Sequence, residues 1–266
     1  MALYDYKVVV CGCTKNSAPY IEGVLENMYK MRDIFKEFHL VLYENDSTDD
    51  TVNILENFGR DHTDFHLFSE KGVRENIRTI VIAQGRNKLL DYVNEKFSDY
   101  DYVIMADFDV MDLYSNDDFK QIFKHDVSTW DVLTANCNGP YYDIWPLRIE
   151  KSLWEKEIHG DLWPDIIDYD CWQKYDRERY VYRNQVIIPK TKPLIPVHSA
   201  FGGFAIYRMQ IIQNCKYLGH DIDAKFATCE HTHFNLEIRE KNKGRIFICP
   251  SFIVKCQQEH VKQKMS

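Results

Sequence analysis

The chain has 266 residues, 45% of them hydrophobic, which is enough to bury the core of one large domain or two closely packed subdomains. Its formal net charge of −8 argues against a nucleic-acid-binding surface, because phosphate contacts need clustered Lys and Arg. No apolar run approaches the roughly 20 residues that span a bilayer, and the N-terminal residues lack a signal-peptide pattern, so the sequence predicts a soluble, cytoplasmic protein.

The first part of the chain alternates between short apolar runs and amphipathic segments. Strands separated by helices of this length are typical of right-handed βαβ units, so we predict an α/β, Rossmann-like fold with a mostly parallel central sheet flanked by helices. Ser47 and Thr48 are N-cap candidates for the second helix. The predicted strands are 7–11, 39–43, 65–68 and 102–106, and the predicted helices are 19–35, a segment after Thr48, and 77–97.

The second half of the chain has a different composition. All five tryptophans lie between Trp130 and Trp172, interleaved with tyrosines and aspartates. Such a segment offers flat apolar faces and carboxylates, which suit a polyhydroxylated acceptor. A further strand is predicted around Gly202 and Gly203, a helix from Cys229 to near Gly244, and extended segments at 245–248 and 251–254. The eight cysteines show no metal-ligand spacing, and we expect free thiols.

Three polar clusters follow the first, second and fourth predicted strands. They contain Thr14, the segment 44–49, and Asp107-Phe108-Asp109. Ligands of parallel α/β sheets bind beyond the carboxyl ends of the strands, so the clusters are expected to share one crevice. If strand geometry continues, Asp107 and Asp109 project from one face with Phe108 on the other. Each cluster taken alone could be an ordinary loop with helix caps.

The acid pair also predicts a cation. Two carboxylates this close repel each other unless a cation neutralises them, and a hard divalent ion that also holds phosphate oxygens would do so. Arg86 and Asn87 precede the fourth strand and add a positive charge. An acid for a base or ribose, a cation for phosphate and a metal-binding pair are what a nucleoside diphosphate requires.

Three further features downstream are candidates for function. The pair Gly202-Gly203 would let backbone approach a ligand closely or would form a bulge. Glu230, at a predicted helix N-terminus, would act on a hydroxyl as a general base, contact the acceptor, or complement the helix dipole. His260 would be an exposed histidine or a third metal ligand.

Six short segments occur in an order that resembles a known family. They are 41–49, 85–87, 107–109, 141–145, 201–203 and 229–231, within residues 7–254. Their combination resembles the nucleotide-sugar glycosyltransferases of the GT-A fold, and is similar to the fungal capsule-associated mannosyltransferases and to related enzymes of large DNA viruses. The usual Glu-Asp pair of these enzymes is Glu230-His231 here.

The resemblance implies a role for each matching residue. Glu230 would be the acceptor-facing acid and the candidate catalytic residue. Mn²⁺ or Mg²⁺ would bind Asp107, Asp109 and His260, with His231 or His233 as substitutes for His260. The implied donor-binding residues are Thr14, Glu44, Asp46, Arg86, Asn87, Asp107, Phe108, Gly202 and Gly203.

The resemblance also implies an activity and a division of the chain. We expect a hexosyl- or N-acetylhexosaminyltransferase that uses a nucleotide-sugar donor, UDP-sugar favoured over GDP-sugar, and a glycan or other hydroxyl acceptor. Residues 1–112 would be the nucleotide-sugar-binding half and 113–266 the acceptor-binding half, both within one GT-A domain. Retention or inversion of the anomeric configuration stays open.

Two alternatives come from other classes of protein. A phosphohydrolase of the haloacid dehalogenase type also carries Asp-x-Asp after a strand, but on the first strand of its core, whereas three βα units precede the pair here. Met111 also occupies a position where such enzymes have Thr or Val. The other alternative is a protein that binds a nucleotide sugar without turning it over.

Overall fold

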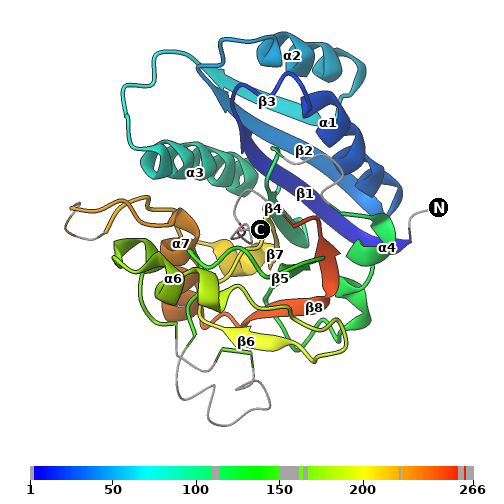
Figure 1. Cartoon of the computed structure of the whole chain (residues 1–266). Helices are drawn as coiled ribbons and strands as arrows, with labels where there is room; N and C mark the ends of the chain where they lie inside the picture. The colour runs from blue at the N-terminus through cyan, green and yellow to red at the C-terminus, as the bar shows by residue number, and fades with distance from the viewer. Residues whose placement is uncertain are drawn as a thin grey trace.

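The computed structural model describes residues 3–109, 114–149, 162–163, 167–221, 223, 225–256 and 261. Its centre is an eight-stranded sheet with the strand order β3-β2-β1-β4-β7-β5-β8-β6 (Figure 1). The pairings from β3 to β4 are parallel, as is that of β5 with β8; β7 and β6 pair antiparallel with their neighbours. The strands are β1 (Tyr4–Thr14), β2 (Phe35–Asn45), β3 (Phe65–Glu70), β4 (Tyr102–Ala106), β5 (Val132–Cys137), β6 (Ile195–Val197), β7 (Phe204–Arg208) and β8 (Ile246–Val254).

Helices cover both faces of this sheet. The strict alternation of side chains along β1 divides the core, because Val8 and Val10 face one layer and Val9 and Cys11 face the other. The first layer includes α1 and α2, and the second includes α3 and α7 (Figure 1). The α-helices are α1 (Ile21–Tyr29), α2 (Thr51–Asp61), α3 (Arg78–Lys96), α4 (Asn116–Phe119), α6 (Arg177–Tyr180) and α7 (Glu230–Asn242); 3₁₀ turns are η1 (Lys30–Asp33), η2 (Ile122–Lys124), η3 (Cys171–Gln173), η4 (Tyr182–Asn184) and η5 (Met209–Ile212).

The predicted fold class is confirmed, as are the four strands of the first half and the long helix before β4. The first helix was predicted too long. It ends at Tyr29 and is followed by η1, and Phe35 starts β2 instead of ending a helix. The reason is tertiary: Phe35 pairs with Tyr4 of β1 and its ring is buried between the sheet and Phe119.

The predicted caps of α2 are also wrong. The helix begins at Thr51, whose backbone N–H donates to Asp49 Oδ1 at 3.1 Å. Ser47 Oγ accepts from the backbone of Asn16, and Thr48 N donates to the side chain of Asn16, so both residues tie the loop after β2 to the loop after β1. The two loops therefore hold each other at the carboxyl edge of the sheet.

The two halves of the chain are joined in one sheet. β4, the last strand of the first half, pairs antiparallel with β7 of the second. The two extended segments predicted near the C-terminus form a single strand, β8, whose pairing with β5 shifts register between Ala135 and Asn136. The assignment of residues 1–112 to the donor and 113–266 to the acceptor stays a proposal.

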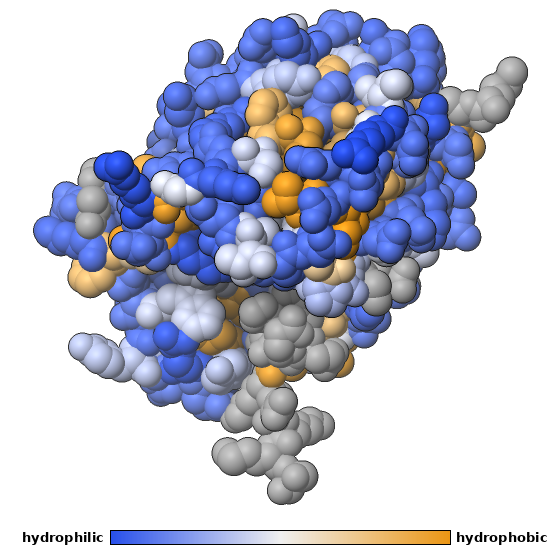
Figure 2. Space-filling model, turned by 90° about the horizontal axis from the view of Figure 1, so that it is seen from above, coloured by the Kyte–Doolittle hydropathy of each residue, from blue (hydrophilic) through white to orange (hydrophobic). Residues whose placement is uncertain are grey.

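Within the described residues, no helix is long and apolar enough to cross a membrane. Hydrophilic residues cover most of the face seen from above, with hydrophobic residues exposed in smaller areas between them (Figure 2). All eight cysteines are free and seven are buried, which confirms the expected thiols.

Candidate functional site

The Asp107-Phe108-Asp109 segment leaves β4 at its carboxyl end, as predicted. Asp107 N donates to Gly203 O at 2.9 Å, which fixes the segment beside the turn that precedes β7. The Phe108 ring is buried against β1, so close that a Cβ on Gly12 would lie 2.0 Å from it. The side chain of Phe108 therefore packs in the core, and a donor could contact only its backbone. The Asp107 side chain, by contrast, is 26% exposed.

A buried arginine joins the acid segment to the helix α7. Arg86 of α3 forms an ion pair with Glu230 Oε1 at 2.9 Å and approaches Asp107 Oδ1 at 3.7 Å. It also donates to His231 Nε2, and its guanidinium lies over the ring of Phe201. Burial, the largest single effect, would lower the pKa of Arg86, but Glu230 together with its other acidic neighbours outweighs burial and the pKa is raised. Arg86 is therefore a fixed positive charge at the centre of the site.

The site holds more carboxylates than Arg86 can neutralise. Asp107, Asp143 and Glu230 interact with this one guanidinium, and Asp109 adds a further charge beside Asp107. Burial raises the pKa of Asp107 well above its usual range, the charge of Asp109 raises it further, and Arg86 opposes them. Such an excess of negative charge favours the binding of a cation or of protons.

The acid pair fits a hard divalent cation. Carboxylate oxygens are the ligands that Mg²⁺ and Mn²⁺ prefer, and Asp107 lies 3.7 Å from Arg86 while the charges of Asp109, Asp143 and Glu230 act against its own. No three His, Cys, Asp or Glu side chains of the described residues lie close enough to hold a metal ion on their own. A bound diphosphate could supply further oxygens to a cation held by Asp107 and Asp109.

The histidines proposed as a third metal ligand are placed differently. His260 lies outside the described residues. His231 is buried, stacks on Phe201 and accepts from Arg86; burial, and next the charge of Arg86, hold the pKa of His231 well below its usual range. His233 hydrogen-bonds Lys216 O at 3.1 Å. Both described histidines therefore have other partners in this conformation.

Sequence reasoning missed one acid of the site. Asp143 follows β5, and its Oδ2 accepts from Gly202 N at 2.7 Å. Burial raises the pKa of Asp143 to about 7, against the opposing effect of the Gly202 N–H, and the charge of Glu230 raises it further. The residue lay within the segment 141–145 that carries the family resemblance, but nothing in its spacing assigned it a role.

The glycine pair forms a turn before β7 rather than a bulge within a strand. Gly202 and Gly203 have φ angles of 72° and 81°, which L-residues with a side chain rarely adopt. A Cβ on Gly202 would also lie 2.6 Å from Ala135 O. The turn connects two acids of the site, since Gly202 N donates to Asp143 and Gly203 O accepts from Asp107 N.

Replacing Gly202 with alanine is therefore expected to destabilise the protein more than replacing Gly72 does. Gly72 has a similar φ of 76° but open space around it, so Gly72→Ala reports the backbone strain alone, roughly 1–2 kcal/mol. Gly202→Ala should cost roughly 1–3 kcal/mol more, because Ala135 O must move. Urea unfolding of both variants measures the difference; equal losses would contradict the close contact.

Asp46 lies at the end of β2, where a ligand of the sheet would bind. Its φ of 52° is in the left-handed region. Its carboxylate accepts from Gly72 N at 2.5 Å and Val73 N at 3.2 Å, and the pKa of Asp46 is lowered first by the Gly72 amide and then by Asn45. Asp46 thus holds the loop after β3 and keeps its charge, and contact with a nucleotide base stays a prediction.

The other two donor-binding candidates at these strand ends, Glu44 and Thr14, are buried. Glu44 is fully buried, and accepts from Ser47 N at 2.7 Å and from Ser69 Oγ at 2.5 Å. Thr14 is 8% exposed, with its Oγ1 2.6 Å from Ser17 Oγ. The geometry gives Glu44 a positioning role in the loop, which we propose in place of the expected donor contact.

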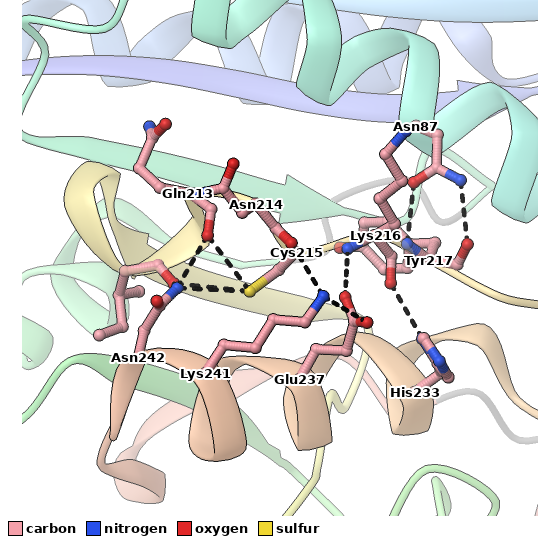
Figure 3. A network of polar contacts seen from close by, with 11 residues as sticks. Asn87, Gln213, Asn214, Cys215, Lys216, Tyr217, His233, Glu237, Lys241 and Asn242 are labelled. Atoms are coloured by element: carbon pink, nitrogen blue, oxygen red, sulfur yellow. Dashed lines mark hydrogen bonds and ion pairs between the residues drawn. The ribbon is translucent and has the colours of Figure 1, made fainter.

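The side-chain amide of Asn87 also forms hydrogen bonds within the protein. Its Nδ2 donates to Tyr217 O at 2.9 Å and its Oδ1 accepts from Tyr217 N at 2.8 Å. Figure 3 shows how this pair joins α3 to the segment 213–217, which Glu237 in turn connects to α7 through Lys216 N. Asn87 therefore supports the position of α7, and its contact with the donor stays a prediction.

Comparison with known proteins places the chain by fold. No protein-family model matches the sequence, and no curated protein matches it either. Among solved structures, the chain resembles the mannosyltransferase PcManGT from Pyrobaculum calidifontis in complex with GDP-Man and Mn²⁺, with a TM-score of 0.54 and 16% identity over 95% of this chain and 57% of that one.

It also resembles S. aureus TarS, with a TM-score of 0.52 and 18% identity over 96% of this chain and 37% of that one. TarS 1–349 in complex with UDP gives a TM-score of 0.50 and 17% identity, over 96% and 62%. The chain thus spans less than two thirds of each of these proteins. The likeness confirms the predicted GT-A-type fold; at these identities it shows the fold alone.

Proposed function

We propose that the chain is a metal-dependent glycosyltransferase that moves a sugar from a nucleoside-diphosphate donor to a hydroxyl acceptor. One observation carries the proposal: the carboxylates Asp107 and Asp109, next to the buried Arg86, stand at the carboxyl end of β4 in a GT-A-type sheet. Ligands of such sheets bind at this edge. The excess of negative charge there favours a cation, and a diphosphate would supply further oxygens to that cation.

The proposed roles follow from what each group can reach. Asp107 and Asp109 would hold Mn²⁺ or Mg²⁺, which when bound would stabilise the negative charge on the departing diphosphate. Asp46 would face the base or ribose from the neighbouring loop, and the backbone of Gly203 would let the donor sugar approach closely. Arg86 keeps Asp107 and the N-terminus of α7 at a fixed separation.

The donor is proposed at the level of its class. PcManGT is described with GDP-Man and Mn²⁺, and TarS 1–349 with UDP, so the fold accommodates both nucleotides. We retain UDP-sugar as the first candidate and a hexosyl or N-acetylhexosaminyl group as the one transferred. The closer kinship with fungal capsule-associated mannosyltransferases is a proposal that rests on the six sequence segments alone.

The position of the acid pair bears on the phosphohydrolase alternative. Such an enzyme would carry its nucleophile at the end of the first strand, and in this structure that position holds Thr14, with the acid pair on β4. A protein that only binds a nucleotide sugar would make the same contacts with the donor as an enzyme does. Turnover of the bound donor distinguishes the two.

A thermal-shift screen of GDP-mannose, UDP-glucose and UDP-N-acetylglucosamine, each with and without Mn²⁺, tests the proposal. A donor at about 100 times its Kd stabilises the folded state by about 2.7 kcal/mol, which should raise the Tm by roughly 5–10 °C for a chain of this size. We expect the rise to depend on Mn²⁺. A flat response to all three donors would contradict the proposal, and binding without release of the nucleoside diphosphate would favour the non-catalytic alternative.

A further inference from the structure

Asp143 differs from the other acids of the site in its partners. Glu230 is 8% exposed and paired with Arg86 at 2.9 Å. Asp107 and Asp109 lie on the segment to which we assign the diphosphate. Within the part of the chain that the structure describes, Gly202 N is the one hydrogen-bond donor to the Asp143 carboxylate, and it engages Oδ2 only. Asp143 is also partly exposed, so its second oxygen can meet a ligand.

We propose that Asp143, rather than Glu230, is the catalytic base that takes the proton from the acceptor hydroxyl. The inference rests on the proposed glycosyltransferase function and deepens it. It assigns Glu230 a positioning role instead, because Glu230 Oε1 is engaged by the buried guanidinium of Arg86 at 2.9 Å and the Glu230 side chain is only 8% exposed.

The surroundings of Asp143 suit proton transfer near neutral pH. A general base works best when its pKa lies near the working pH, and burial brings the pKa of Asp143 to about 7. Arg86, the cation facing it from α3, is fixed in the charged form. Burial raises the pKa values of its buried thiol and phenol neighbours, so these groups stay neutral; they are Cys137, Tyr141, Tyr142, Cys171 and Cys229.

The metal-site geometry supports the same division of roles. No three acidic, histidine or cysteine side chains among the described residues converge closely enough to hold one ion, so Asp143 is not a third ligand beside Asp107 and Asp109 in this conformation. Asp143 comes from the second half of the chain, on the segment that continues to Trp145. The Trp145 ring contacts Trp172, which is 39% exposed, so this segment leads from Asp143 to an aromatic surface that an acceptor could reach.

The proposed step balances as a single displacement. The acceptor oxygen forms a bond to the anomeric carbon of the donor sugar as its proton passes to the Asp143 carboxylate. The bond from the anomeric carbon to the phosphate oxygen breaks, and its electron pair leaves with the nucleoside diphosphate. Because attack and departure occur on opposite faces, the anomeric configuration inverts.

Hydrolysis of the donor, with water as the acceptor, tests this step without knowledge of the natural acceptor. With Mn²⁺ and whichever of the three donors is turned over, kcat/KM of the wild-type protein should fall as the pH drops through the pKa of Asp143, because the base becomes protonated; a cation beside Asp107 lowers this pKa from its metal-free value of about 7. Asp143→Asn should lower kcat by about 10²-fold or more and abolish this acidic limb. Its carboxamide oxygen can still accept from Gly202 N, so donor binding in the thermal-shift assay should be unchanged.

Two controls separate a base from a merely structural acid. Asp168→Asn makes the same chemical change at an exposed carboxylate of the same half and should leave the pH profile unaltered. Asp107 also has a raised pKa, and a limb that persisted in Asp143→Asn would assign the titration to Asp107 and overturn the proposal. Asp143→Glu keeps a carboxylate and should retain a pH-dependent limb with reduced kcat.

The stereochemistry of the product is an independent readout. For an α-linked donor such as GDP-mannose, ¹H NMR of the sugar released first should show the β anomer before mutarotation. The α anomer as the first product would overturn the assignment of a base. If the wild-type protein neither binds nor turns over any donor, the proposed function itself fails, and that result is distinct from an active wild-type protein whose Asp143→Asn variant is unchanged.

The stability of the same variant checks the environment of Asp143 without any substrate. The folded pKa of about 7 lies above the unfolded value of about 3.9, so the folded state binds the extra proton between these values and stability falls as pH rises from 4 to 7. The Asp143→Asn variant has no ionisable group at this position, so its stability does not fall in this way as the pH rises. Its Tm relative to wild type should therefore increase by several degrees from pH 5 to pH 8, and a difference independent of pH would contradict the raised pKa of Asp143.

Discussion

Asp109→Ala is expected to abolish Mn²⁺-stimulated hydrolysis of a nucleotide-sugar donor, by about 10²-fold or more, while the protein stays folded. The physical reason is the charge of the leaving group: without the second carboxylate the cation is held weakly, and an electrostatic contribution of a few kcal/mol at the departing diphosphate is lost. The Tm in the absence of ligand should stay the same or rise, because removing Asp109 relieves its repulsion of Asp107.

Asp61→Ala is the matched control for this experiment. Asp61 is an exposed carboxylate at the end of α2, remote from the carboxyl end of β4. Its variant should hydrolyse the donor at the wild-type rate with the same dependence on Mn²⁺ concentration. Unchanged turnover in Asp109→Ala would contradict the proposed metal role of Asp107 and Asp109.

Arg86→Leu is expected to have the largest effect on stability. Removing one member of a buried ion pair typically costs about 3–5 kcal/mol, because the other charge stays buried without a partner. Here Glu230 is 8% exposed, and Asp107 and His231 lose a partner too. At about 2–4 °C per kcal/mol, the Tm should fall by roughly 6–20 °C. Arg86→Lys should recover only part of the loss, since an ammonium group cannot reproduce the planar contacts of the guanidinium.

A double-mutant cycle and a surface control sharpen this prediction. Arg86→Leu combined with Glu230→Leu should be more stable than the sum of the single losses implies, because the buried Glu230 carboxylate is no longer left without its partner. Arg32→Leu removes the exposed member of an ion pair with the partly buried Asp64, at 3.2 Å; Asp64 keeps its hydrogen bond from the Tyr29 hydroxyl, so the change should cost at most about 1 kcal/mol. Additive losses in the cycle would show that Arg86 and Glu230 do not interact as described.

The parallel half of the fold was predictable because its signals are local. Buried strands such as Tyr102–Ala106 are continuous apolar runs, and helix-length segments separate them, which specifies βαβ units. The end of β2 was not predictable in this way. Glu44 reads as the start of a polar loop, yet it is fully buried because β2 is paired on both sides at this point, with Thr14 and with Ser69.

The site was predictable only where its residues follow strands. Asp107 and Asp109 could be placed at the edge of the sheet from the run of apolar residues before them. The partners of Arg86 could not be predicted from the sequence. Glu230 and His231 lie about 145 positions away and meet Arg86 only through the packing of α3 and α7. Asp143 was missed for the same reason, since its contact with Gly202 spans 59 positions.

The contacts of three predicted site residues change the chemistry that we propose for the site. Asn87 and Phe108 carried sequence signals of a ligand contact, but the structure uses the amide of Asn87 to bond Tyr217 and the ring of Phe108 to fill the core. Glu230 was the first candidate for a catalytic base, and its pairing with Arg86 favours a positioning role. Polar residues near a strand end therefore include groups that build the site as well as groups that would bind the ligand.

The most direct test of the central claim is a crystal structure with Mn²⁺ and UDP or GDP, with the metal located by its anomalous signal. We predict a single Mn²⁺ peak beside the carboxylates of Asp107 and Asp109, in contact with the phosphate oxygens of a nucleotide bound at the carboxyl end of β4. A nucleotide bound elsewhere on the protein, or a metal peak away from both carboxylates, would contradict the assignment of this edge of the sheet as the donor site.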